Sequence, residues 1–208
     1  MGLFNAHSRA AADAFLRPSF GLANQLARFW WQITWTVLCR FTPNPLHRWR
    51  CLVLGAFGAR LGRSNFVYPN AKIWAPWLLE TGDVVTIGAG AIIYNPGGAF
   101  LDHHTIVSED AYLCGASHNY NSPEFTYLAQ PIRTGAYVWI CARAIVLPGV
   151  SCCEGSVLGA GAVTARDLDA WTVYAGNPAN AIRKRTLLLD GLPVADSLSG
   201  AEQAPARS

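Results

Sequence analysis

Charged side chains are scarce in this sequence, since only 14% of its 208 residues are Asp, Glu, Lys or Arg, whereas 51% are hydrophobic. A helical bundle needs many exposed Glu and Lys residues, so the composition argues against one. The 19 glycines suit a fold that has many tight corners between buried aliphatic positions. We therefore expect an all-β protein, and the length favours one substantial domain with extensions at its ends.

Long apolar runs are also missing. A transmembrane helix needs about 18–20 uninterrupted apolar residues, whereas the apolar stretch Phe29–Cys39 is interrupted by Gln32 and Thr34 and flanked by Arg28 and Arg40. The N-terminus lacks the basic, apolar and small-residue order of a cleavable signal peptide. We therefore expect a cytoplasmic protein.

The six cysteines lack the spacing of a zinc finger, and the adjacent pair Cys152-Cys153 is not arranged as a metal clamp. Buried thiols in a reducing compartment are the simplest interpretation. We expect no bound metal.

Acidic residues are almost absent from the first part of the chain. Residues 1–63 contain eight arginines and one acid, Asp13, a balance of +7 that leaves −4 for the rest. Apolar residues at helical spacing predict a helix from about Asn24 to Cys39, and a second short helix is expected at Leu46–Phe57. The segment also holds four of the eight tryptophans, and two interpretations stay open. Residues 24–50 contact the inner face of a membrane as a peripheral element, or their aromatic face packs on the protein or a second subunit, which is the commoner case.

From Leu61 onward, large aliphatic residues recur every six positions. This period is neither the two of a strand nor the 3.6 of a helix, and it indicates a short strand plus a corner, repeated in stacked coils. The pattern predicts a parallel β-helix over residues 61–175, between a helical lead segment (1–60) and a C-terminal part (176–208) with a short helix and a mobile tail. The phase of the six-residue repeat resets at Ile87 and slips again before Leu101. The most regular run follows a break at 119–131 and comprises Ile140, Val146, Cys152, Leu158 and Thr164.

One histidine, His118, stands where a run of repeats ends and the irregular segment Asn119–Pro131 begins. Loops that project from a regular scaffold often carry binding and catalytic groups. A lone histidine is more often structural than catalytic, but a neutral imidazole can accept the proton of an attacking hydroxyl group near pH 7. His118 is the candidate general base, and Tyr120 and Glu124 of the same loop are candidate substrate-binding residues.

Several motifs resemble those of one known family, the hexapeptide-repeat acyltransferases, whose repeats form a left-handed triangular β-helix. Within that family the chain resembles the subfamily assigned to colanic acid biosynthesis. The similarity extends from about Leu26 to Arg185 and rests on the segments RFTPNPLHRWR, IWAPWLLETGD, IIYNP, YLCGASHNYNSPEF, IVLPGV and AGNPANAIRKR.

The resemblance implies an acetyl-CoA-dependent O-acetyltransferase that modifies a sugar hydroxyl in surface polysaccharide biosynthesis. The acceptor would be a sugar or a lipid-linked glycan, and no nucleic-acid partner is expected. The resemblance further implies a homotrimer whose active sites lie between subunits.

The resemblance also implies roles for individual residues. His118 would take the proton of the sugar hydroxyl, and Asn95 would orient that hydroxyl in the acceptor site. Asn95 has a second interpretation as a turn residue before Pro96, since Asn-Pro is itself a turn signal. The coenzyme would lie along the C-terminal coils, with Trp139, Ala142 and Ala160 beside its pantetheine arm and Arg166 and Arg183 near its phosphates.

Two positions depart from the family pattern. Asn119 stands where relatives often carry Asp, so the base lacks a neighbouring carboxylate and a backbone carbonyl could orient it instead. Cys152-Cys153 replaces the more usual Ile-Gly, which we interpret as variation within the core.

Two other functions stay open. One is a non-catalytic trimeric scaffold with the same β-helix. The other is a zinc-dependent lyase similar to the γ-class carbonic anhydrases, which would need three histidine ligands. His103 and His104 point to different sides of a strand, so at most one of them could join His118, and the repeats offer no third candidate.

Overall fold

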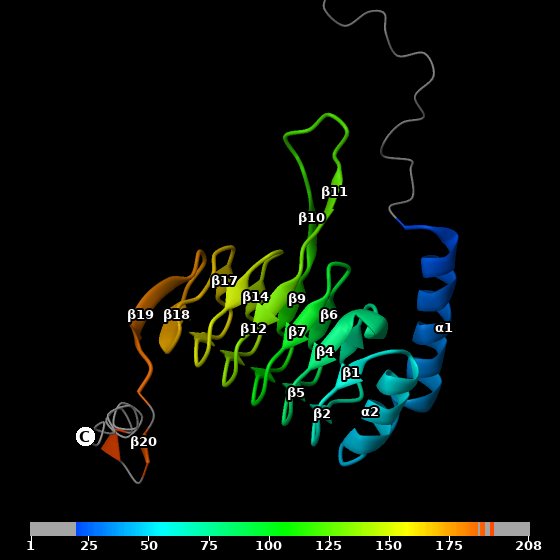
Figure 1. The fold of residues 1–208 in the computed structure, drawn as a ribbon, viewed down its shortest axis with the longest axis horizontal. Helices are drawn as coiled ribbons and strands as arrows, with labels where there is room; N and C mark the ends of the chain where they lie inside the picture. The colour runs from blue at the N-terminus through cyan, green and yellow to red at the C-terminus, as the bar shows by residue number, and fades with distance from the viewer. Residues whose placement is uncertain (1–19, 187, 190–191, 194–208) are drawn as a thin grey trace, which may run out of the picture.

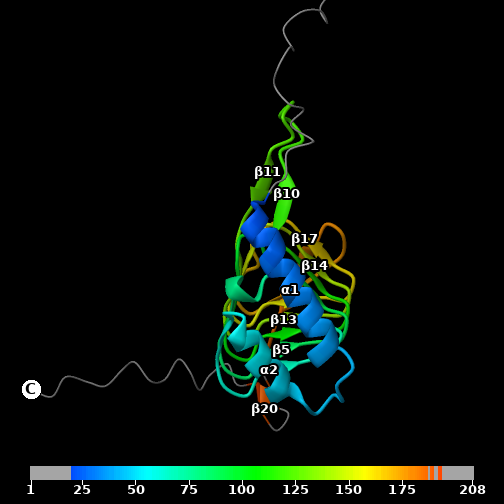
Figure 2. The same cartoon turned by 90° about the vertical axis from the view of Figure 1, so that its right-hand side faces the viewer.

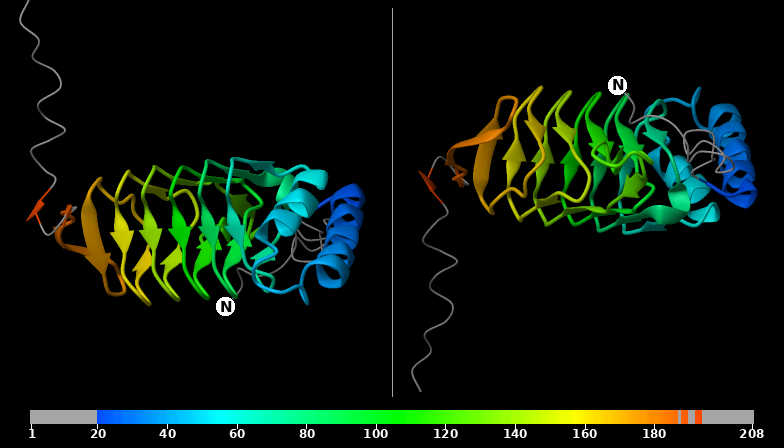
Figure 3. Two further views of the ribbon diagram at one scale, coloured as in Figure 1. Left: turned by 90° about the horizontal axis from the view of Figure 1, so that it is seen from below. Right: turned by 90° about the horizontal axis from the view of Figure 1, so that it is seen from above.

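The computed structural model describes residues 20–186, 188–189 and 192–193. Most of them form a solenoid with three walls, each a sheet of parallel strands stacked along the long axis (Figures 1 and 3). The first wall contains β1 (Arg60–Leu61), β4 (Leu79–Thr81), β7 (Ala99–Leu101), β12 (Ile132–Thr134) and β15 (Ser151–Cys152). The second contains β2 (Phe66–Val67), β5 (Thr86–Ile87), β8 (Ile106–Val107), β13 (Trp139–Ile140), β16 (Val157–Leu158) and β18 (Thr172–Ala175). The third contains β3 (Lys72–Ile73), β6 (Ile92–Tyr94), β9 (Tyr112–Cys114), β14 (Ile145–Val146) and β17 (Val163–Thr164).

The core is a set of inward columns, one for each wall. Equivalent residues of successive coils lie directly beside one another in the parallel register, so their side chains stack along the axis. The predicted parallel β-helix is therefore confirmed. The second and third walls contribute the columns Val67, Ile87, Val107, Ile140, Leu158 and Ile73, Ile93, Leu113, Val146, Thr164, none of them more than 5% exposed.

The phase slips of the repeat all lie at one edge of the solenoid. Leu61 pairs with Thr81, an interval of 20 residues, whereas Thr134 pairs with Cys152, an interval of 18. The extra residues of the early coils occupy the corners that connect the third wall to the first, where the short 3-10 helix η2 (Pro76–Leu78) is also found. We call this edge the hairpin edge, because the chain segment 115–131 also leaves the solenoid there.

Two helices cover the N-terminal end of the solenoid, α1 (Leu22–Leu38) and α2 (His47–Ala56) (Figure 2). On α1, Trp31 and Trp35 face inward, and the indole N–H of Trp31 donates to the carbonyl of Ile73 at 2.7 Å. On α2, the guanidinium of Arg50 is fully buried and donates to the carbonyls of Val67 and Pro43. Arg50 therefore ties the turn between the helices to the first coil, so this one arginine of the lead segment has a structural role.

The expected short C-terminal helix is wrong for the residues described. Asn180–Lys184 form strand β19, which runs antiparallel to β18, and β20 (Leu188–Leu189) pairs with β21 (Leu192–Pro193). The turn at Gly176–Pro178 reverses the chain, so β19 covers the last edge strand of the second wall and satisfies its backbone groups. The predicted mobile tail falls largely outside the described residues.

Candidate active site

The segment after β9 leaves the hairpin edge as a two-stranded antiparallel hairpin, β10 (Ala116–His118) and β11 (Tyr127–Ala129), which projects from the solenoid (Figure 1). Its base is fixed by Gly115, whose N–H donates to the Tyr94 carbonyl at 2.6 Å. A Cβ at Gly115 would lie 2.6 Å from that same oxygen, so only glycine allows this close approach. The hairpin therefore starts from a defined point of the third wall.

His118 lies at the outer end of β10, opposite Tyr127. Its Nδ1 is 3.0 Å from the carbonyl oxygen of Phe125, and its ring stacks on the Phe125 ring with the centroids 4.5 Å apart. A carbonyl oxygen can only accept a hydrogen bond, so Nδ1 must carry the proton, and the lone pair of a neutral imidazole is then on Nε2. This is the tautomer in which Nε2 can act as a base.

The amide of Asn119 does not take the place of the missing carboxylate. Its Oδ1 accepts from the backbone N–H of Asn121 at 3.2 Å, while the backbone N–H of Asn119 donates to the Thr126 carbonyl at 2.8 Å and closes the hairpin turn. Asn119 thus shapes the turn, and the Phe125 carbonyl orients His118. The backbone carbonyl that the sequence suggested as an orienting group is present.

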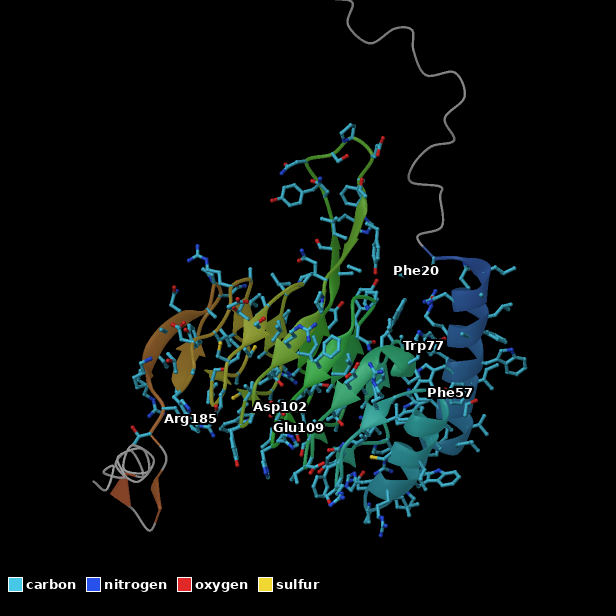
Figure 4. All side chains as sticks on the ribbon, viewed as in Figure 1. Phe20, Phe57, Trp77, Asp102, Glu109 and Arg185 are labelled. Carbon is cyan, nitrogen blue, oxygen red and sulfur yellow. The ribbon has the colours of Figure 1, made fainter. Side chains whose placement is uncertain are left out.

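A cluster of aromatic residues supports the imidazole from the side of the solenoid. The Tyr127 ring packs edge-on against His118 at 5.4 Å, and its hydroxyl is 2.9 Å from the hydroxyl of Tyr94. Burial, together with the hydrogen bond to Tyr94, raises the pKa of Tyr127, so the phenol stays neutral. Phe20 packs on both Tyr127 and Trp74, and it lies beside the upper end of α1 (Figure 4).

The start of α1 completes this cluster through Arg28. Its guanidinium lies 4.7 Å from the Trp74 ring centroid, in the geometry of a cation–π contact, and its Nε donates to Asn24. The lead helix is therefore joined to the base of the hairpin. Sequence reasoning missed these supporting residues, although Trp74 comes directly after β3 and Tyr94 ends β6. These two strands pair at an interval of 20, which would have placed both residues in one column.

Asn95 is buried, with 1% of its surface exposed, and both the oxygen and the nitrogen of its amide bond one residue of the preceding coil. Its Oδ1 accepts from the Ala75 N–H at 3.1 Å, and its Nδ2 donates to the Ala75 carbonyl at 2.9 Å. This pair of bonds fastens two corners of the hairpin edge together. The geometry favours the structural interpretation of Asn95, and its role toward an acceptor stays a prediction.

The two candidate substrate-binding residues lie in the turn of the hairpin. Tyr120 is 79% exposed, and Glu124 is also exposed, with its backbone N–H bound to the Ser122 hydroxyl. Both lie in the turn that follows His118 on the same hairpin, and their contact with a substrate stays a prediction.

The candidate coenzyme residues lie on the C-terminal coils. Ala142 and Ala160 occupy equivalent corners one coil apart, where the Gly161 N–H donates to the Ala142 carbonyl at 3.0 Å. Trp139, on β13 just before Ala142, is 44% exposed and donates from its indole to the Ser108 hydroxyl. The structure brings these three residues together along one face.

The two candidate phosphate-binding arginines lie on different parts of the solenoid. Arg166 follows β17 at the hairpin edge, whereas Arg183 lies on β19 of the second wall. Both side chains are exposed.

A single chain does not bring the base and the coenzyme residues together. Ala142 and Ala160 lie at corners between the second and third walls, whereas His118 projects from the hairpin edge. Glu109 belongs to the same corner column as Ala142, since its carbonyl accepts from the Arg143 N–H, and it lies across the solenoid from the hairpin (Figure 4). The structure therefore places His118 and these two alanines on different edges of the chain.

His103 and His104 lie at the edge between the first and second walls, away from His118. His103 accepts the Asp83 N–H on its Nδ1 at 2.9 Å, and the His104 ring stacks on Tyr137. The part of the chain that the structure describes contains no group of three His, Cys, Asp or Glu residues arranged to hold a metal ion.

Comparison with known proteins gives extensive sequence matches. The chain is 36% identical over 158 residues to a protein of Escherichia coli K12 named "Putative colanic acid biosynthesis acetyltransferase WcaF", and the match covers 76% of this chain and 86% of that protein. No protein-family model matches the chain.

Solved structures with the same fold are more distant in sequence. A maltose O-acetyltransferase from Clostridium difficile superposes with a TM-score of 0.70 at 19% identity, covering 80% of this chain and 90% of its own. A hexapeptide-repeat acetyltransferase from Vibrio cholerae, complexed with acetyl coenzyme A, has a TM-score of 0.69 at 18% identity, with coverage of 78% and 87%. At this level of identity the two structures establish the fold.

Proposed function

The chain belongs to the hexapeptide-repeat acetyltransferase family, and we propose that it transfers the acetyl group of acetyl-CoA to a hydroxyl group of a sugar or a lipid-linked glycan in surface polysaccharide biosynthesis. The name of the Escherichia coli relative supports the pathway, and the names of the solved structures support acetyl-CoA and a sugar acceptor. The observation that carries the proposal is the His118 tautomer, because it leaves Nε2 free as a base on a projecting hairpin.

The reaction follows from this tautomer. Nε2 of His118 accepts the hydroxyl proton as the sugar oxygen attacks the thioester carbonyl carbon of acetyl-CoA. Backbone N–H groups stabilise the oxyanion of the tetrahedral intermediate, which then collapses by breaking the carbon–sulfur bond. The imidazolium returns its proton to the departing thiolate, so the products are the acetyl ester and coenzyme A, and His118 is neutral again.

We propose a homotrimer in which the hairpin of one subunit faces the coenzyme groove of the next. The support is the separation of His118 from Ala142 and Ala160 onto different edges of one chain. In this arrangement the pantetheine arm lies along these two alanines and Trp139, with the phosphates near Arg166 and Arg183. Tyr120 and Glu124 contact the acceptor, and the location is the cytoplasm, where acetyl-CoA is available.

Acetyl-CoA consumption tests the function directly. The protein is incubated with acetyl-CoA and a panel of free sugars, nucleotide sugars and lipid-linked oligosaccharides, and release of coenzyme A thiol is measured. We expect turnover with at least one acceptor. Failure of every class to release thiol above the acceptor-free rate would contradict the proposal.

A thermal shift separates an inactive scaffold from an enzyme that lacks its acceptor. Saturating acetyl-CoA at about 100 times its Kd adds ~2.7 kcal/mol of stability, which corresponds to about 5–10 °C in Tm for a chain of this length. An unchanged Tm would favour the non-catalytic scaffold.

A further inference from the structure

Helix α1 has apolar residues on two opposite faces. Trp31 and Trp35 face the solenoid, whereas the residues about half a turn away face outward. The outward residues recur at helical spacing along the whole helix and form one continuous face. This outer stripe consists of Leu22, Leu26, Phe29, Trp30, Ile33 and Val37, which are 38–70% exposed.

The same end of the molecule carries further exposed apolar residues. In the turn after the helix Phe41 is 82% exposed, and on the outer side of α2 Leu52 is 68% exposed. Figure 2, which looks onto this end of the molecule, shows both helices in front of the solenoid. The outer stripe is the continuous part of this exposed apolar surface, and such a face marks a contact with a partner.

The residues around the outer stripe are positively charged, which indicates an anionic partner. No Asp or Glu occurs between Asp13 and Glu80. Arg40 follows α1 and Arg48 lies on α2, and both are exposed. Among the residues described, neither forms an ion pair.

A groove beside α2 likewise combines positive charge with apolar side chains. It is lined by Arg48 and Arg63 together with the apolar Leu52 and Ala56. Positive charge next to exposed aliphatic carbon matches a surface that combines anionic groups with an apolar layer. A second copy of this face would bring arginines against arginines, which opposes self-association.

We propose that this end of the molecule docks on an anionic membrane surface, with the outer stripe inserted at the lipid interface and Arg40 and Arg48 at the head groups. No helix in the described ranges is long and apolar enough to cross a bilayer, so the contact is peripheral. Both interpretations of the lead segment then apply, because one face of α1 packs on the protein and the other meets the lipid.

The docked orientation brings the hairpin near the lipid. In the third wall β3, β6 and β9 are consecutive neighbours, and at about 4.8 Å per strand β9 lies ~10 Å from β3. Helix α1 lies between β3 and the lipid and adds about 10 Å, so an acceptor glycan that extends about 20 Å from the lipid would meet His118, which follows β9. This consequence rests on the proposed function, whereas lipid docking itself does not.

Vesicle co-sedimentation of the full chain tests the docking without acetyl-CoA or acceptor. We expect binding to vesicles of phosphatidylglycerol and phosphatidylethanolamine, weak binding to phosphatidylcholine alone, and release as NaCl rises from about 0.05 to 0.5 M. Absence of binding to the anionic vesicles at low salt would overturn the proposal.

Matched variants locate the contact. Ile33→Gln should weaken the partition coefficient about fivefold, since one apolar side chain no longer enters the lipid. Ile182, on β19, is 59% exposed against 38% for Ile33, and Ile182→Gln should leave the partition coefficient unchanged. Equal effects of the two changes would overturn the assignment. A changed molecular mass of Ile33→Gln by light scattering, without a change in vesicle binding, would show that the stripe joins copies of the chain.

Two matched double variants test how much the arginines contribute to vesicle binding. Arg40→Gln/Arg48→Gln should weaken binding about tenfold or more, while Arg133→Gln/Arg143→Gln, with the same change in net charge on the solenoid, should weaken it little. Equal losses for the two pairs would mean that only net charge matters and would contradict a defined docking face. Far-UV circular dichroism and Tm confirm that each variant is folded.

Discussion

Replacing Asn95 by alanine distinguishes a structural from a catalytic role for this amide. The substitution removes one hydrogen bond accepted from the Ala75 N–H and one donated to the Ala75 carbonyl. Ala75 is itself 0% exposed, so its N–H loses its partner in a place that water does not reach, whereas its carbonyl still accepts from the Leu78 N–H at 3.1 Å. The buried N–H left without a partner costs ~1–3 kcal/mol and the second lost hydrogen bond ~0.5–1.5 kcal/mol, which gives about 2–4 kcal/mol for the two.

Thermal unfolding measures this loss. For a chain of this length 1 kcal/mol corresponds to about 2–4 °C in Tm, so Asn95→Ala should lower Tm by roughly 5–15 °C. Asn70→Ala is the matched control, since Asn70 is exposed at another corner of the solenoid and its loss should cost less than ~0.5 kcal/mol. Asn95→Asp should be destabilising as well, because the carboxylate cannot donate to the Ala75 carbonyl.

The reasoning would be refuted by an Asn95→Ala variant that unfolds at the wild-type temperature but no longer transfers acetyl groups. That result would mean that the amide turns toward an acceptor and that its bonds to Ala75 contribute little to stability.

Two further predictions concern a buried thiol and the base of the hairpin. Burial, with a smaller effect of the nearby Asp167, raises the pKa of Cys152 from 9.0 to about 12, so between these values the native state keeps a proton that the unfolded chain loses. The free energy of unfolding should therefore be highest below pH 9 and fall by ~1.4 kcal/mol per pH unit up to about pH 12. Denaturant titrations at several pH values should show a shallower fall for Cys152→Ala than for the wild-type protein. An equal slope of unfolding free energy against pH for the two proteins would contradict the account. Gly115→Ala should cost about a hundredfold in acetyl transfer, because its Cβ would meet the Tyr94 carbonyl oxygen at 2.6 Å and displace the hairpin. Gly55→Ala, with open space around the new Cβ, is the control, and equal activity of the two variants would be inconsistent with a fixed hairpin base.

The sequence was most informative where a periodic pattern coincided with burial. The six-residue interval predicted the walls because each coil buries one large residue per wall, as Ile140, Val146 and Leu158 illustrate. The slips in the phase of the repeat were informative as well, since they mark the longer corners at the hairpin edge. The C-terminal helix was predicted wrongly because pairing with the open edge of β18 outweighed local propensity in Asn180–Lys184.

The candidate site was predictable in part. His118 stood out because the repeat stops there, and the absent carboxylate at Asn119 pointed to a carbonyl partner. The identity of that partner, Phe125, depends on how the hairpin turn folds back, which no spacing in the sequence specifies. The roles of Phe20 and Arg28 could not be predicted from the sequence either, since these residues reach the base of the hairpin only through the packing of α1 on the solenoid. The left-handed coil of the resembled family stays a prediction, as does the assembly into trimers.

The most direct test of the central claim is the rate of acetyl transfer by His118→Ala, measured with an acceptor that the wild-type protein uses. His118 is half-buried on a projecting hairpin, so we expect Tm and the Kd for acetyl-CoA to stay close to their wild-type values. Loss of a general base should lower kcat by about 10²–10⁴-fold. Wild-type turnover by a folded, coenzyme-binding His118→Ala protein would contradict the assignment of His118 as the base.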